Sequence, residues 1–159
     1  MIQRKQTLYL LLSGILMAIL PFVTSYAITT QDHYLNFNTF GLYQIGGAGV
    51  EGDLLIRPTW GLAVLNVIIV LLSIISIFLY KRRVLQMRVT VYNLLLKIGL
   101  LILGGMYIYK FGELYPDALK GVRAWVALPF ISIILDYLAH RAIAVDERLV
   151  QYLKSGRLR

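Results

Sequence analysis

The segment PTWGLAVLNVIIVLLSIISIFLY, residues 58–80, decides the class of the fold because it contains no charged residue. A helix of about 20 apolar residues crosses the hydrocarbon core of a bilayer, which is about 30 Å thick. Trp60 and Tyr80 stand at the two ends, where amphipathic rings suit the headgroup region, and Pro58 suits a first helical turn. The segment therefore predicts a transmembrane helix.

Three other apolar runs of similar length occur at about 7–28, 89–109 and 123–144. The whole chain is 58% hydrophobic and 15% charged, with a mean hydropathy of +0.71. Soluble domains are about 45–50% apolar and about a quarter charged. We therefore expect an all-α membrane protein: a single membrane domain, residues 1–159, built as a bundle of four transmembrane helices.

Lysine and arginine are distributed unevenly over the predicted loops. Eleven lie on the side of the two termini and four on the other, and Lys97 lies within a span. Because cytoplasmic loops are enriched in these residues, we expect both termini in the cytoplasm. We expect a basic cytoplasmic surface that contacts anionic lipid headgroups. Its residues are Lys81, Arg82, Arg83, Arg88, Arg148, Lys154, Arg157 and Arg159.

The first span admits a second interpretation. Arg4 and Lys5, the apolar stretch 8–23 and the small residues around Tyr26 fit a secretory signal peptide. The apolar run is longer than usual for such a peptide, and Pro21 lies inside it. We therefore expect a retained anchor.

The predicted outer loop, residues 29–57, and the tail, residues 145–159, carry local patterns. Residues 34–40 alternate apolar and polar side chains, and a glycine-rich segment at 46–49 precedes a second short apolar run. This predicts a small extracytoplasmic β-hairpin, which either docks a partner protein or only covers the bundle. The tail predicts a short amphipathic helix, suited to the membrane surface or to a partner helix.

Lys97 and Asp136 are the most informative residues inside the predicted spans. Each lies eight residues from the expected cytoplasmic end of its helix, or about 12 Å deep at 1.5 Å per residue. Ionisable side chains at such depth usually face the bundle interior and are paired. We therefore predict a Lys97–Asp136 ion pair within an intramembrane polar network that also contains Asn93, His140 and Asn66.

Two interpretations of this network compete. In the first, the ion pair locks two helices in register or engages a partner subunit. In the second, Asp136 and His140 belong to a proton relay, because histidine titrates near neutral pH and burial raises the pKa of a carboxyl group. The outer half of the spans contains no acidic residue to continue a relay, so we expect the structural role.

The sequence offers little for catalysis. It contains no cysteine and only two histidines, and it has no phosphate-binding loop, nucleophile elbow or HExxH motif. We therefore expect no enzymatic activity, no cofactor and no metal site.

Three stretches carry a family resemblance: residues 1–12, residues 78–88, and residues 141–150 together with the terminal Arg157-Leu158-Arg159. They resemble a family of bacterial four-span inner-membrane proteins of unknown function, typical of the Bacteroidota. The resemblance implies a multi-pass protein of the bacterial inner membrane, and it implies no activity and no catalytic residues.

We expect a non-enzymatic accessory or scaffold subunit of an inner-membrane complex, linked to protein export. Its expected partners are other integral membrane proteins and no specific nucleic acid, and a homo-oligomer remains open. One alternative is a small ion- or proton-coupled transporter or channel subunit that uses Lys97, Asp136 and His140. Another is a periplasmic sensor whose hairpin binds a ligand.

Overall fold

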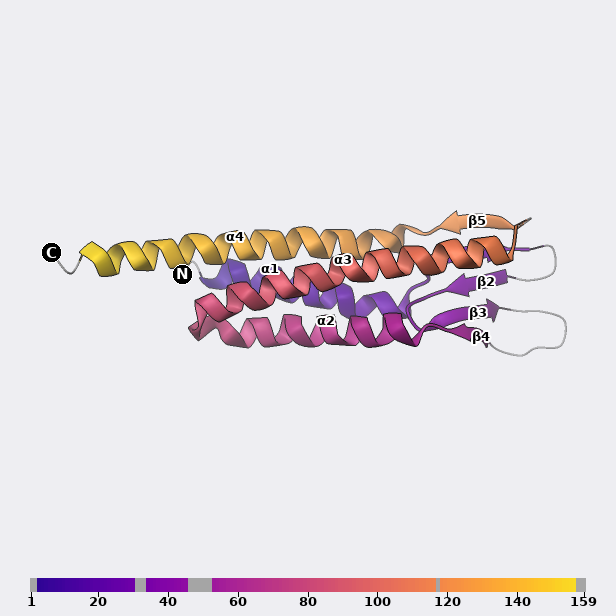
Figure 1. Cartoon of the computed structure of the whole chain (residues 1–159), viewed down its shortest axis with the longest axis horizontal. Coiled ribbons are helices and arrows are strands. Elements are labelled where there is room, and N and C mark those ends of the chain that lie inside the picture. Colours follow the sequence, from indigo (N-terminus) through magenta and orange to yellow (C-terminus); the bar gives the residue numbers. More distant parts are fainter. Residues whose placement is uncertain (1–2, 31–33, 46–52, 117, 157–159) are drawn as a thin grey trace.

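The computed structural model describes residues 3–30, 34–45, 53–116 and 118–156, which form four α-helices and a five-stranded sheet at one end of them (Figure 1). The helices are α1 (Gln3–Ile19), α2 (Trp60–Phe78), α3 (Arg83–Leu114) and α4 (Ala127–Gly156). Short 3-10 turns are η1 (Leu20–Phe22), η2 (Leu79–Lys81) and η3 (Ala124–Val126). The strands are β1 (Tyr26–Thr29), β2 (Tyr34–Phe37), β3 (Gly41–Ile45), β4 (Leu54–Pro58) and β5 (Leu119–Val122).

The sheet corrects the expected fold class. All its neighbouring strands are antiparallel, in the order β4-β3-β2-β1-β5, so the extramembrane element is a sheet and not a small hairpin in one loop. The prediction missed β1 because its apolar residues extended the first span to residue 28. It missed β5 because four residues of mixed polarity gave no strand signal. The glycine-rich segment 46–49 lies outside the described residues.

The helices also differ in length from the expected spans. The second span agrees with α2, whereas α3 begins inside the expected loop 81–88 and runs on to Leu114. The predicted helix of the tail is the continuation of α4. Three helical segments are long and apolar enough to cross a membrane: Trp60–Lys81, Arg83–Leu114 and Ala124–Leu153. The first helix is shorter, an apolar segment over Gln6–Phe22.

Each helix buries one narrow seam, and the seams meet at the centre of the bundle. Buried residues recur at alternating steps of four and three, which is the 3.5-residue period of helices packed at a shallow angle. The seams are Gln6, Leu10, Ser13 and Met17 in α1, continued by Leu20 in η1; Leu62, Asn66, Ile69, Ser73 and Ser76 in α2; Gln86, Thr90, Asn93, Lys97 and Leu100 in α3; and Pro129, Ser132, Asp136, Ala139, Ile143 and Asp146 in α4.

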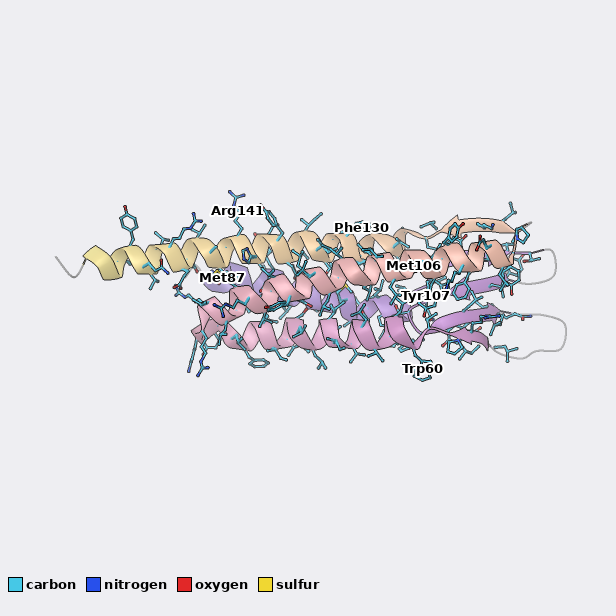
Figure 2. The ribbon with its side chains drawn as sticks, viewed as in Figure 1. Trp60, Met87, Met106, Tyr107, Phe130 and Arg141 are labelled. Carbon is cyan, nitrogen blue, oxygen red and sulfur yellow. The ribbon has the colours of Figure 1, made fainter. Side chains whose placement is uncertain are left out.

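The bundle is polar inside and apolar outside. More than half of the seam residues carry polar or charged side chains. Large apolar side chains cover the outer faces, among them Trp60 at 72% and Phe78 at 73% exposure (Figure 2). Water would disfavour such a surface, and hydrocarbon favours it. Together with the three long apolar helices, this distribution indicates a membrane protein.

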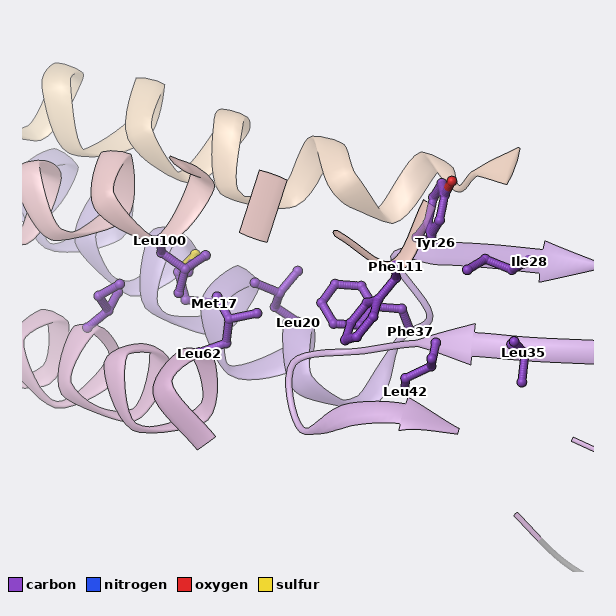
Figure 3. Packing of buried hydrophobic residues seen from close by; sticks show 11 residues of the cluster. Met17, Leu20, Tyr26, Ile28, Leu35, Phe37, Leu42, Leu62, Leu100 and Phe111 are labelled. Atoms are coloured by element: carbon purple, nitrogen blue, oxygen red, sulfur yellow. The ribbon is translucent and has the colours of Figure 1, made fainter. Parts of the chain in front are cut away.

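An apolar core joins the sheet to the end of the bundle that lies opposite the chain termini (Figure 3). The ring of Phe111, near the end of α3, packs edge-on against Phe37 of β2 with centroids 5.4 Å apart. Tyr107, one turn earlier in α3, stacks on the ring of Phe111 with the centroids 6.0 Å apart. Tyr26 of β1 is buried beside them, and burial raises the pKa of its hydroxyl. The sheet is therefore attached to α3 by aromatic packing.

Gly41 is the first residue of β3 and packs directly against β4. A Cβ at this position would lie 2.6 Å from a methyl group of Leu55 and 2.7 Å from the backbone oxygen of Arg57. We predict that Gly41→Ala destabilises the protein by about 1–3 kcal/mol, the usual cost of overpacking, as measured by thermal unfolding in mild detergent.

The matched control is Gly121→Ala in β5, where an added Cβ meets no atom within 4 Å. It should leave the melting temperature nearly unchanged. Equal melting temperatures for both variants would contradict the close approach at Gly41.

Candidate functional site

The candidate site is a cluster of polar side chains around Lys97, in the middle of the bundle. Lys97 comes from the seam of α3 and Asp136 from the seam of α4, and both side chains are fully buried. The Lys97 Nζ lies 2.6 Å from the Asp136 Oδ2. This is the one salt bridge found across the part of the chain that the structure describes, and it joins the two residues that the spacing predicts to lie at equal depth.

All three N–H donors of the Lys97 ammonium have acceptors. They point to Asp136 Oδ2 at 2.6 Å, to Ser132 Oγ at 2.7 Å and to Ser13 Oγ. An ammonium group has three donors and no acceptor, so its hydrogen-bonding capacity is used completely. Neither Ser13 nor Ser132 belongs to the network predicted from the sequence.

The hydroxyl groups of Ser13 and Ser132 in turn donate hydrogen bonds to carboxylate and backbone oxygens. The Ser13 hydroxyl donates to Asp136 Oδ1, and the Ser132 hydroxyl donates to the backbone oxygen of Ser13 at 3.2 Å. The serine hydroxyl oxygens are 2.9 Å apart. Because Ser13 belongs to α1 and Ser132 to α4, the ion pair of α3 and α4 also binds the first helix. Three helices are therefore joined at one depth.

Asn93 links this cluster to α2. Its amide nitrogen donates to Ser73 Oγ at 2.8 Å and lies 3.5 Å from Asp136 Oδ2. The Ser73 hydroxyl donates in turn to the backbone oxygen of Ile69. Gly14 allows α1 to pack closely against α2 at this level, since a Cβ at Gly14 would lie 3.2 Å from the Cβ of Ser73. The side-chain oxygen of Asn93 is buried without a partner among the described atoms.

Two members of the predicted network lie outside the cluster. Asn66 is buried on the α2 seam, but its amide donates to the backbone oxygen of Met17 at 3.1 Å, so it joins α2 to α1. His140 is only half-buried and lines a surface hollow with Met87 and Arg88. Its placement in the network was wrong because the seam steps from Asp136 by three residues to Ala139, not by four.

A second polar layer lies nearer the end of the bundle that carries the chain termini. The Gln6 amide of α1 donates to the carboxylate of Asp146 of α4. The Gln86 amide of α3 donates to the backbone oxygen of Ser76 at 3.0 Å, and the hydroxyls of Ser76 and Thr90 are 3.1 Å apart. On the other side of Lys97, toward the sheet, Asn66 is a polar seam residue at the level of Met17. The apolar seam residues on this side include Met17, Leu20, Leu62 and Leu100.

The basic surface is only partly within the described structure. Lys81, Arg82 and Arg83 line one hollow with Glu147 and Val150 of α4. The Arg83 guanidinium donates to the backbone oxygen of Asp146 at 3.2 Å, which ties the start of α3 to α4. Arg88 and Arg148 are exposed elsewhere on the helices. The side chain of Lys154, together with Arg157 and Arg159, lies outside the described residues.

The arrangement offers no familiar catalytic or metal-binding constellation. Within residues 3–30, 34–45, 53–116 and 118–156, no group of three or more histidine, cysteine, aspartate or glutamate side chains could hold a metal ion. The polar cluster is instead a connected set of hydrogen bonds that links the four helices.

Residues 2–154 match the family model described as Domain of unknown function (DUF4293). The chain belongs to this family. No curated protein matches the chain. The match covers nearly all of the sequence, so the sheet, the polar cluster and the helices, apart from the last two residues of α4, lie within the DUF4293 domain.

Asp136 is the only carboxylate that contacts the Lys97 ammonium in the described part of the DUF4293 domain. We predict that Asp136→Asn lowers the free energy of unfolding by about 3–5 kcal/mol, because it leaves a buried ammonium without its counter-charge. Chemical unfolding in mild detergent, followed by circular dichroism, measures the loss.

Two further variants control this result. Lys97→Met combined with Asp136→Leu should recover most of the stability, because apolar residues of similar size often replace a buried ion pair without loss. His140→Ala, outside the cluster, should change the stability by less than about 0.5 kcal/mol. A double variant as unstable as Asp136→Asn would contradict the assigned cause.

Proposed function

We propose that the protein is a non-enzymatic accessory or scaffold subunit of a complex in the bacterial inner membrane. The observation that carries the proposal is the Lys97 ammonium, whose three donors all have acceptors. These acceptors come from α1 and α4, so the contacts of this one group hold α1, α3 and α4 in register, which is the role of a structural lock. The proposed function does not extend to protein export, because no described residue indicates it.

A transporter or channel subunit is the second candidate. The side-chain oxygen of Asn93 favours this candidate, because it is buried beside the ion pair without a partner. Such an oxygen can accept a hydrogen bond from a water molecule or from another donor. Against it, apolar seam residues follow Lys97 toward the sheet, and His140 lies apart from the pair. An Asp136-dependent ion flux in proteoliposomes would favour the transporter over the scaffold.

The sheet supplies a docking element for a protein partner. β4 and β5 are its two edge strands, so each has one side without a neighbouring strand. Every residue of β5 is exposed, and the side chains of Leu119 and Val122 are apolar. Unpaired strand edges are templates for the addition of another strand. A partner segment that pairs with β5 would extend the sheet beyond the helices.

The proposed orientation places both termini in the cytoplasm and the sheet on the outer side. It rests on the excess of lysine and arginine near the termini and the α2–α3 turn. The hollow lined by Lys81, Arg82 and Arg83 then faces the inner leaflet. Anionic lipid headgroups are the partners that such a basic surface attracts.

We predict that Val122→Pro abolishes co-purification of a membrane-protein partner in mild detergent. The Arg123 amide donates to the backbone oxygen of Ser25 at 3.0 Å, across the β1–β5 pair. Because amide directions alternate along an antiparallel strand, the Val122 amide points away from β1. Proline there removes an outward amide and keeps the ladder. Mass spectrometry of the purified complex identifies and counts the partners.

Val122→Ile is the matched control, since it keeps both the outward amide and the apolar side chain. The melting temperature of the isolated protein should be the same for both variants. A partner that co-purifies equally with the two variants would rule out docking through β5.

Labelling of single introduced cysteines tests this orientation, because the sequence itself contains no cysteine. Leu119→Cys, 78% exposed on β5, should react with a membrane-impermeant maleimide in intact spheroplasts. Gln151→Cys, near the end of α4, should react only after the cells are opened. The reverse pattern would overturn the proposed topology.

A further inference from the structure

An apolar cavity of about 250 Å³ lies where the bundle meets the sheet. Its walls include Leu20, Leu62, Leu100, Gly104, Pro129 and Phe130. Figure 3 shows Leu20, Leu62 and Leu100 converging on this junction, and Figure 2 places Phe130 on α4 near its start. Neither the scaffold proposal nor the polar cluster uses this space.

The cavity arises because side chains are missing from the seam. The buried series of α3 runs through Asn93, Lys97 and Leu100, and the next seam position is Gly104. A Cβ at Gly104 would meet no atom within 4 Å. Opposite it, the α4 seam begins with the compact ring of Pro129. One layer of the bundle is therefore left unfilled.

The lining makes this space suitable for hydrocarbon and unsuitable for water. Apart from Ser25 and Thr39 at the sheet end, its walls are side chains of aliphatic and aromatic residues, proline and the two glycines 104 and 105. Apolar cavities of even about 150 Å³ stay dry and take up small hydrocarbons. An empty space of this size forfeits the packing contacts of its whole lining.

The mouth of the cavity lies on a lipid-facing surface. Gly105 and Phe130, which line it, are exposed. The neighbouring outward side chains are apolar as well: Ile102, Met106, Ile131 and Ile134. In a membrane, the molecules in contact with this surface are lipid chains, present at very high local concentration.

We propose that the cavity binds one acyl chain of a membrane phospholipid, which enters sideways between α3 and α4 past Gly105. A flexible unbranched chain fits the space left at Gly104, where the seam has no side chain, and the bilayer supplies such chains directly. The proposal rests on the membrane placement argued above and does not depend on a protein partner. Gly104 is the specificity-determining position, because any larger side chain there would occupy the site.

The test is native mass spectrometry of the detergent-purified full-length chain, titrated with dioleoyl phosphatidylglycerol. The wild type should retain one lipid molecule in preference to further ones. Gly104→Leu should bind that molecule at least about tenfold more weakly, because the loss of two buried methylene contacts already has this effect. Dioleoyl phosphatidylethanolamine should give the same result, because the cavity contacts the chain and not the headgroup.

Gly99→Leu is the matched control. It lies on the same helix, is exposed, and has equally open space at its Cβ, so it gains the same helix propensity without filling the cavity. It should retain the lipid. Gly105→Leu, which narrows the mouth, is the second variant if Gly104→Leu fails to fold, and it should also lose the lipid.

Two results would overturn the proposal. Equal lipid retention by the wild type, Gly104→Leu and Gly99→Leu would place the lipid elsewhere. Absence of a retained lipid from the wild type, with a higher melting temperature for Gly104→Leu than for Gly99→Leu, would show a dry void. Co-purification of a protein partner is measured separately, so failure here leaves the scaffold proposal standing.

Discussion

The Lys97 ammonium imposes the constraint on which the rest of the bundle depends. A charged group with three donors, buried among apolar helices, is stable only when an anion and further acceptors surround it. Asp136 supplies the charge, and Ser13 and Ser132 supply the remaining oxygens. Because these residues come from three helices, the relative depth and rotation of those helices are set by one cluster.

The same requirement explains why the interior of the bundle is polar. Helices surrounded by lipid gain little from burying apolar side chains, so polar contacts and close packing have to hold them together. Asn66, Gln86 and Asp146 each make such a contact between helices. Most large apolar residues of the described helices lie on the outer surface or at the junction with the sheet. There, aromatic rings do the packing that serine and asparagine do elsewhere.

The sequence allowed part of this arrangement to be predicted. The pairing of Lys97 with Asp136 was predicted from their equal distances to the expected ends of the two spans, although α3 begins before residue 89 and α4 continues beyond residue 144. His140 was misplaced since a four-residue step was assumed where the seam alternates between four and three. That alternation, applied from Asp136, would also have indicated Ser132. The sheet was harder to predict, because strands β1 and β5 pair across about 90 residues of chain, and short strands depend on partners that local patterns do not reveal.

Helix α3 is a single rod of 32 residues that passes from the basic hollow, through Lys97, to the aromatic contact with the sheet. At 1.5 Å per residue it is about 48 Å long. The contact at Phe111 and the buried charge are thus joined by continuous helix. A force that displaces the sheet along the axis of α3 would therefore act on the opposite end of the molecule as well. The contacts of Lys97 with α1 and α4 would resist this sliding of α3.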